Sequence, residues 1–213
     1  IKGRIKQTDM SVPYPDGDYS YYTRYEDQRE YPIYCRIPRP VRGSRRSSSD
    51  GGLERTVPVD EARASGLAEQ IILDVNELAE GHDFCQVSGR EVSPDGGLLA
   101  YAVDVEGRRI HNVRFKDLTV DKMLADELKG VTSNIVWAND GKTLFYTRQD
   151  PLTLRWYQIY RHVLGTQQEQ DILVYEEADD TFNCGVSKSR SKRYLLVASY
   201  QTLSTEYRYL DAD

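Results

Sequence analysis

A chain of 213 residues is long enough for one large domain or two small ones, each with an apolar core. Its net charge of −6 gives no electrostatic support for a nucleic-acid partner. The longest apolar runs, such as 98–103, hold about six residues, whereas a membrane-spanning helix needs about 20. Composition therefore argues against nucleic-acid binding and against a membrane-spanning helix.

Tyrosine compensates for a low content of other hydrophobic residues. Hydrophobic residues make up 39% of the chain, and 16 residues are tyrosines. The half-apolar tyrosine ring suits strands with one wet face, so the composition favours strands of this kind.

The three cysteines, Cys35, Cys85 and Cys184, are odd in number and far apart in the sequence. They form neither a CxxC pair nor a disulfide framework. We therefore expect reduced, buried and unreactive thiols in a cytoplasmic protein.

The N-terminal part predicts a helix end followed by a hairpin. Residues 1–11 resemble the end of a helical segment that begins upstream. The tyrosine-rich runs 19–25 and 31–36 flank a polar turn at 26–30, which is typical of a β-hairpin. The segment 39–66 that follows is rich in Arg, Ser and Gly and predicts a long solvated loop.

Two roles are open for this loop. Its arginines could contact an acidic partner, but a loop of this composition is more often a disordered insertion. A short helix is expected near 58–67, and a short strand at 70–75 ends in a turn at Asn76.

The rest of the chain repeats four short strands about every 45 to 50 residues, as propeller blades do. We therefore predict an all-β fold, a partial β-propeller of about 3.5 four-stranded antiparallel blades. The expected blades are 12–80 with the long loop 39–66, then 81–130, 131–178 and an incomplete one at 179–213. The strands expected from residue 98 onward are 98–104, 110–118, 126–129, 143–148, 157–164, 171–175, 185–188, 194–199 and 206–210.

The repeated turns explain how the blades are built. Asp95-Gly96 and Asp140-Gly141 supply the positive backbone angle of a tight reversal, and Ser93 and Asn139 are expected to cap these turns. The residues that follow alternate, so that Leu144 and Tyr146 should face one neighbouring blade while Phe145 faces the other. The repetition is thus architectural and carries no chemistry.

No residue of this chain is predicted to be catalytic. A Gly-x-Ser-x-Gly nucleophile elbow and a phosphate-binding loop are both absent from the sequence. The histidines His82, His111 and His162 have no metal-binding spacing, so no metal and no cofactor is expected. His162 is expected to be a strand residue hydrogen-bonded to a neighbouring blade.

The acidic pairs Glu176-Glu177 and Asp179-Asp180 are expected to be solvated turn carboxylates, because adjacent strand residues point to opposite faces and rarely converge on one substrate atom.

Several motifs, in order along the chain, resemble the propeller of the prolyl oligopeptidase family of serine peptidases. They are residues 73–76, 92–101, 136–141, 145–151, 158–166, 170–177 and the acidic pair 179–180. The short link 151–154 looks more like oligopeptidase B than prolyl oligopeptidase itself. The resemblance covers about residues 5–213 except the loop 39–66.

The resemblance implies a seven-bladed propeller that covers an α/β-hydrolase domain, admits short peptides and excludes folded proteins. Oligopeptidase B cleaves after Lys or Arg. The chain would then be the propeller part of such a serine endopeptidase, inactive alone, with short peptides, the hydrolase domain and the remaining blades as partners. The alternatives are a stand-alone propeller scaffold that binds proteins or peptides, and prolyl oligopeptidase proper, which cleaves after Pro.

The candidate site residues follow from their expected position in loops on one rim of the propeller. The loops that enter the innermost strands are expected at 81–84, 131–134 and 180–183, and a loop between middle strands at 149–155. If the hydrolase domain covers this rim, the cavity-facing residues are Thr132, Ser133, Thr181 and Phe182.

An arc of blades that does not close leaves its two end faces bare. These faces are expected to be apolar and uncovered. They are predicted to include Tyr19, Tyr21, Tyr194 and Leu196.

Overall fold

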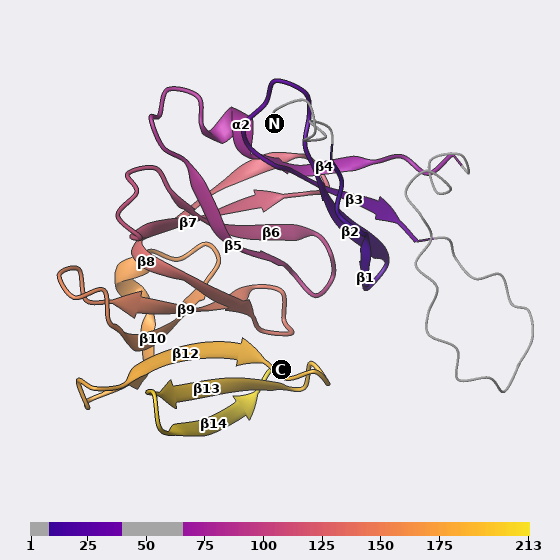
Figure 1. Ribbon diagram of the computed structural model, residues 1–213. Coiled ribbons are helices and arrows are strands. Elements are labelled where there is room, and N and C mark those ends of the chain that lie inside the picture. The colour runs from indigo at the N-terminus through magenta and orange to yellow at the C-terminus, as the bar shows by residue number, and fades with distance from the viewer. Residues whose placement is uncertain (1–8, 40–65) are drawn as a thin grey trace, which may run out of the picture. The chain divides into compact units, whose positions relative to one another are not determined.

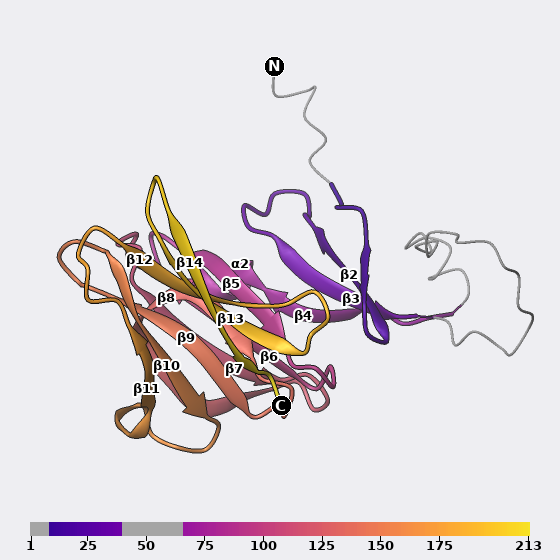
Figure 2. The same cartoon turned by 90° about the horizontal axis from the view of Figure 1, so that it is seen from below.

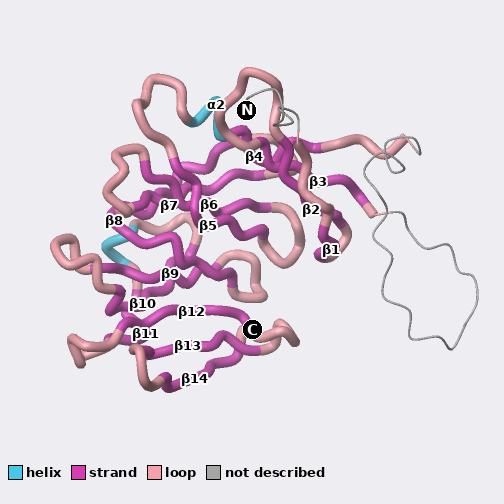
Figure 3. Tube along the Cα trace, viewed as in Figure 1, coloured by secondary structure: helices cyan, strands magenta, loops and turns pink. Residues whose placement is uncertain are grey.

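The computed structural model describes residues 9–39 and 66–213, and these consist almost wholly of antiparallel strands and their connections (Figure 3). The predicted all-β fold class is confirmed. Two compact units, Ile1–Glu80 and Gly81–Asp213, are treated separately below. Within the described residues, no helix has the length and apolar character needed to cross a membrane.

The first unit contains one antiparallel sheet in the order β1-β2-β3-β4. The predicted hairpin is confirmed by the pairing of the second and third strands, and the buried residues Tyr22, Ile33, Cys35 and Ile37 form its core. The elements are β1 (Tyr14–Asp16), β2 (Tyr19–Arg24), β3 (Ile33–Pro38), β4 (Gln70–Asp74) and the helix α2 (Val75–Leu78).

Residues 9–11 run in extended form beside β2 and are not helical. Met10 bridges to Arg24, and the Ser11 N–H donates to the Thr23 carbonyl at 2.8 Å. The rest of the predicted helical tail lies outside the described residues. So do almost all of the loop expected at 39–66 and most of the helix expected near 58–67.

Tyr21 was expected on an uncovered face, and that prediction is wrong. Its side chain is only 6% exposed. The ring stacks on Tyr14 of β1 with a centroid distance of 5.7 Å, and the Arg36 guanidinium lies 3.9 Å from the ring centroid of neighbouring Tyr19. The short strand β1, which was not predicted, thus covers part of this face.

The second unit contains a seven-stranded sheet, β11-β10-β9-β8-β7-β6-β5, and a three-stranded sheet, β12-β13-β14 (Figure 1). Both are antiparallel throughout. The strands are β5 (Gln86–Val92), β6 (Leu98–Asp104), β7 (His111–Asp117), β8 (Lys122–Trp137), β9 (Thr143–Gln149), β10 (Trp156–Val163), β11 (Ile172–Glu176), β12 (Asn183–Lys188), β13 (Tyr194–Tyr200) and β14 (Thr205–Asp211), with a short 3-10 helix at Gln168–Gln170.

The strand β8 is longer than the sequence predicted. The short strand predicted at 126–129 is part of one strand of 16 residues, Lys122–Trp137. Its first part pairs with β7 and its second part with β9. Gly130, at a φ of 67°, takes a left-handed conformation that glycine adopts without a steric penalty, between these two parts.

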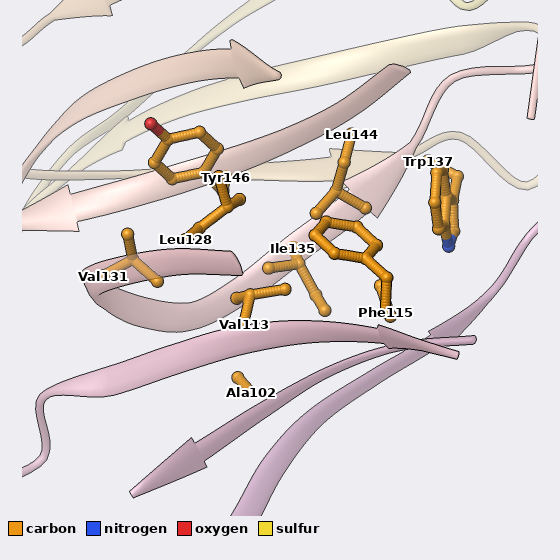
Figure 4. Packing of buried hydrophobic residues seen from close by; sticks show 10 residues of the cluster. Ala102, Val113, Phe115, Leu128, Val131, Ile135, Trp137, Leu144 and Tyr146 are labelled. Atoms are coloured by element: carbon orange, nitrogen blue, oxygen red, sulfur yellow. The ribbon is translucent and has the colours of Figure 1, made fainter. Parts of the chain in front are cut away.

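Two apolar clusters lie on opposite faces of β9, as the alternation predicted. Leu144 and Tyr146 pack with Phe115, Leu128 and other residues of the seven-stranded sheet (Figure 4). Phe145 packs on the other side, in a cluster that includes Cys184, Val186, Leu195 and Val197 of the three-stranded sheet. Figures 1 and 2 show that sheet beside β8, β9 and β10.

The Asp-Gly turns are confirmed, but their caps differ. Gly96 and Gly141 have positive φ angles of 76° and 64°. Ser93 caps the first turn, since its hydroxyl accepts the Leu98 N–H at 2.8 Å. Asn139 does not cap the second turn: its side-chain amide donates to the Lys192 carbonyl at 3.0 Å and so ties this turn to the three-stranded sheet.

Gly89→Ala is expected to destabilise the second unit by about 3 kcal/mol, because interiors do not accept extra atoms without backbone shifts. A Cβ at Gly89 would lie 2.1 Å from the backbone carbonyl oxygen of Ser133. Gly97→Ala is the matched control, since its Cβ would meet only the Asp95 carboxylate at 3.4 Å. Urea unfolding followed by circular dichroism measures both. Equal midpoints for the two variants would contradict the close approach of these backbones.

Candidate functional site

Five connections of the second unit gather at one end of its strands, and we call them the loop rim. The loop rim comprises residues 81–85, 105–110, 150–155, 177–182 and 201–204. β9 and β13 both run toward the left of Figure 1, where the loops that follow them lie.

Hydrogen bonds join several of these loops. The side chain of Gln149, at the end of β9, donates to the Arg109 carbonyl of the loop 105–110 at 2.6 Å. The Trp156 N–H, at the start of β10, donates to the Asn183 side chain at the start of β12 at 3.1 Å. Asn183 pairs with Tyr200, after which the loop 201–204 begins.

Arg155 tethers the connection between the two sheets. Its Nε donates to the Phe182 carbonyl at 2.7 Å, and Nη2 donates to the carbonyls of Glu177 at 2.8 Å and Asp179 at 2.6 Å. Three carbonyls of the loop 177–182 thus converge on one guanidinium. A fixed positive charge with several planar donors suits this role better than a lysine would.

Asn134 joins β8 to β12. Its side-chain oxygen accepts the Thr147 hydroxyl and the Val186 N–H, each at 2.7 Å, and its side-chain nitrogen donates to the Val186 carbonyl at 2.8 Å. Satisfied, partly buried polar groups of this kind help to fix one packing arrangement. The neighbouring sheets are therefore held in register close to the loop rim.

The four predicted cavity-facing residues fall into two pairs. Thr132 and Ser133 lie within β8, where Thr132 is buried and its hydroxyl accepts the Asn134 N–H at 3.0 Å. Thr181 and Phe182 lie in the loop 177–182. The exposed Thr181 donates its N–H and hydroxyl to Asp179, and Phe182 is partly buried. The structure brings the second pair together with Arg155, which sequence reasoning missed.

Glu177 is more than a solvated turn carboxylate, contrary to expectation. It is partly buried and accepts hydrogen bonds from the Ser199 hydroxyl and, at 2.7 Å, from the Tyr175 hydroxyl. The Ser199 hydrogen bond holds the pKa of Glu177 below its ordinary value, assisted by Tyr175 and opposed by partial burial. This carboxylate therefore bridges the end of β11 and the strand β13.

The free energy of unfolding should decrease at low pH because the hydrogen bonds of Glu177 are then weakened. The pKa of Glu177 is depressed in the folded state, so its contribution is present above the unfolded pKa of about 4.5 and is lost as the pH falls below that value. Glu177→Gln should therefore unfold with a weaker pH dependence between about pH 5 and pH 3, as urea midpoints across that range would show. Ser199→Ala should have the same effect. Parallel slopes for wild type and both variants would contradict the bridge.

The histidines do not form a catalytic pair. His111 is buried with Nε2 3.3 Å from the Ser88 hydroxyl, but Nδ1 has no hydrogen-bond partner to orient the ring, and burial lowers the pKa of this imidazole. A nucleophile needs a base that is itself oriented by a third group. The exposed His82 lies in the loop before β5.

His162 is a strand residue bonded to its neighbours, as predicted. It is buried in β10, with Nδ1 2.8 Å from Asp171 and Nε2 3.4 Å from Asp126 of β8. Both carboxylates are themselves engaged, since Asp171 accepts the Tyr146 hydroxyl at 2.9 Å and Asp126 accepts the Gly165 N–H at 2.5 Å. The cluster ties β8, β9 and β10 together and is structural.

The cysteines are free and buried, as expected. Burial raises the pKa of Cys184 to about 12 and also raises that of Cys85, so neither thiol is activated. Over the ranges 9–39 and 66–213, no cluster of three or more His, Cys, Asp and Glu side chains is placed to hold a metal ion.

Comparison with known proteins decides the family. Residues 1–213 match the family described as prolyl oligopeptidase, N-terminal β-propeller domain. The chain belongs to the prolyl oligopeptidase family. The resemblance predicted from its motifs is thus confirmed, and with it the partial propeller.

Two curated relatives align with almost the whole chain. Dipeptidyl aminopeptidase BI of Pseudoxanthomonas mexicana is 40% identical over 210 residues, which cover 98% of this chain and 28% of that protein. Protease 2 of Moraxella lacunata is 31% identical over 212 residues, which cover 99% of this chain and 28% of that protein. The chain therefore spans little more than a quarter of the length of these relatives.

Solved structures agree with the sequence matches. Oligopeptidase B from Leishmania major aligns over 98% of this chain and 26% of that one, with a TM-score of 0.83 and 33% identity. Oligopeptidase B from Trypanosoma brucei, described as a closed form with covalently bound antipain, aligns over the same shares with a TM-score of 0.78 and 30% identity. The chain is the N-terminal propeller part of an oligopeptidase B-like member of the family.

Proposed function

We propose that this chain is the propeller part of a serine-type oligopeptidase that cleaves short peptides after Lys or Arg. The propeller would border the cavity in front of a hydrolase domain, admit short peptides and exclude folded proteins. The observation that carries the proposal is the alignment of nearly the whole chain with peptidases at 40% and 31% identity. A stand-alone binding scaffold is disfavoured for the same reason.

A second specificity is favoured by one specific observation. The relative with 40% identity is named a dipeptidyl aminopeptidase, an enzyme that releases dipeptides from a free amino end, whereas the two oligopeptidase B structures are 33% and 30% identical to this chain. The two activities differ in the substrate end that they require. An endopeptidase accepts a blocked amino end, and a dipeptidyl aminopeptidase needs a free amine.

The test uses the longer protein, in which this chain is joined to its hydrolase domain, and a pair of fluorogenic Arg-Arg substrates. Preferred hydrolysis of the amino-blocked substrate supports the first specificity, and preferred hydrolysis of the unblocked one supports the second. Cleavage of a blocked Gly-Pro substrate instead would indicate prolyl oligopeptidase proper. Absence of hydrolysis of all three substrates would overturn the peptidase proposal in favour of the scaffold.

We further propose that the 213-residue chain alone is inactive, because it supplies no oriented nucleophile and base, and that its compartment is the cytoplasm, which suits buried free thiols. The blade division at 12–80, 81–130, 131–178 and 179–213 belongs to the same proposal. So does the cavity-facing position of Thr132, Ser133, Thr181 and Phe182, which a peptide-based photocrosslinker bound in the longer protein would test.

A further inference from the structure

The connection 164–171 between β10 and β11 is docked on the first part of β8. The Gly165 N–H donates to the Asp126 carboxylate of β8. The Gln168 side chain accepts the Lys129 N–H at 2.8 Å and donates to the Lys129 carbonyl at 3.1 Å. These bonds join the part of β8 that pairs with β7 to the hairpin of β10 and β11. We call this set of contacts the β8 latch.

His162 of β10 lies beside the β8 latch, with a carboxylate oxygen on each side of its ring. Its Nδ1 is 2.8 Å from Asp171 Oδ1, and its Nε2 is 3.4 Å from Asp126 Oδ1. The side chains of His162 and Asp171 are each 1% exposed, and that of Asp126 is 13% exposed. Over the ranges 9–39 and 66–213, no Lys or Arg forms an ion pair with either carboxylate. Two buried carboxylates therefore share one imidazole.

Both carboxylates act as hydrogen-bond acceptors. Asp126 Oδ1 faces the Gly165 N–H, a backbone group that can only donate. The second oxygen of Asp171 accepts the Tyr146 hydroxyl at 2.9 Å. Burial, assisted by Asp171, raises the pKa of Tyr146, so this phenol keeps its proton and donates it. A proton between an imidazole and a carboxylate belongs on the imidazole, the more basic of the two groups.

Hydrogen-bond chemistry then determines the charge of the ring. A neutral imidazole has one N–H and a lone pair on its other nitrogen. A lone pair that faces a carboxylate oxygen is repelled, whereas a second N–H is attracted and offsets one of the two buried negative charges. The remaining neighbours do not alter this balance, because Phe115 of β7 stacks on the ring at 5.9 Å without a charge and Tyr146 of β9 stays neutral.

We propose that His162 is held as an imidazolium, with one N–H directed at Asp126 and one at Asp171, and that loss of the Nε2 proton at alkaline pH opens the β8 latch. The proton passes to solvent, the Nδ1–H stays on Asp171, and the lone pair at Nε2 faces Asp126. The repulsion acts on the carboxylate that also holds Gly165, so the connection 164–171 should leave β8. The two halves of the seven-stranded sheet would thus share a pH-sensitive junction, whatever the activity of the longer protein.

The direction of the pH effect follows from where the proton binds. A solvent-exposed histidine has an ordinary pKa of about 6.5, so the ring in the open latch is neutral above that pH. Closing the latch there takes up one proton, and the ratio of closed to open latch falls by up to about tenfold per pH unit as the pH rises. Below about pH 6 the ring is charged in both states, and closing no longer depends on its proton.

Hydrogen exchange of the longer protein, measured by mass spectrometry, tests the β8 latch without any need for activity. Protection factors of peptides that cover 164–171, corrected for the intrinsic pH dependence of exchange, should fall about tenfold between pH 7 and pH 9. Peptides from β13, in the three-stranded sheet, should keep their protection and serve as the internal reference. Protection of 164–171 that does not change over this range would overturn the proposal.

Asp126→Asn is the matched variant, because its side-chain oxygen still accepts the Gly165 N–H while its amide can donate to a neutral Nε2. Protection of 164–171 in this variant should change less than twofold between pH 7 and pH 9. His162→Gln should also lose the pH dependence, since it has no ring to titrate. His82→Gln, at an exposed histidine, should keep the wild-type profile. A profile of wild-type steepness in Asp126→Asn would contradict the role of His162, even if His162→Gln fails to fold.

Discussion

Trp137→Ala is expected to lower the free energy of unfolding of the second unit by about 4 kcal/mol, because a large buried side chain takes its packing energy with it and leaves a cavity. Trp137 is buried at the end of β8. Its ring meets Phe115 edge-on with centroids 5.8 Å apart, and its indole N–H donates to the Glu91 carbonyl at 2.9 Å. The substitution removes both the ring contact with Phe115 and the indole hydrogen bond.

The second tryptophan of the chain supplies the control. Trp156 is partly exposed at the start of β10, so Trp156→Ala should cost clearly less. Trp137→Phe keeps a packed ring but loses the hydrogen bond, and about 1 to 2 kcal/mol is expected for it. Urea unfolding at low protein concentration measures all three. Equal losses for the two alanine variants would show that Trp137 is not central to the core.

The 213-residue chain on its own is expected to bind hydrophobic dyes and to self-associate. Tyr207 and Tyr209 of β14 are 65% and 73% exposed. They pair with Ala198 and Leu196 of β13, so all four side chains share one face, opposite to the face that Leu195 helps to bury. A bare apolar face of roughly 400 Å² leaves about 10 kcal/mol of burial unrealised, which is comparable to the stability of a whole domain.

Replacing both exposed tyrosines tests this expectation. Tyr207→Ser combined with Tyr209→Ser should markedly reduce dye fluorescence and shift the chain toward monomer in sedimentation velocity. Val12→Ser, at an 84% exposed residue of the other unit, should change neither. The longer protein should not bind the dye, since further blades would cover this face. If the 213-residue wild-type chain is monomeric and does not bind the dye, this apolar face is stable when exposed to solvent.

Sequence periodicity was sufficient for most of the strands from residue 98 onward and for the two-sided packing of β9. Alternation around Phe145 placed neighbouring residues in different clusters because side chains along a strand point to opposite faces, whatever the rest of the fold does. The turns at Gly96 and Gly141 were equally predictable, because few residues other than glycine adopt a positive φ without strain.

The connections between sheets could not be predicted in the same way. Arg155 and Asn134 act on carbonyls and amides far away in the sequence, and no local pattern marks such contacts. Glu177 differs from its exposed neighbour Glu176 only through the donors that the fold brings near it.

The shared strand β8 determines where the second unit can open. Because its first part pairs with β7 and its second part with β9, the two halves of the seven-stranded sheet stay joined through one continuous strand unless one ladder breaks or the strand bends near Val131. The three-stranded sheet is joined to its neighbour by the connection 177–182, side-chain bonds such as those of Arg155, and apolar packing. The second unit should therefore deform most easily at the junction between the seven-stranded and the three-stranded sheet. Substituting Arg155 would loosen this junction without breaking a strand pairing.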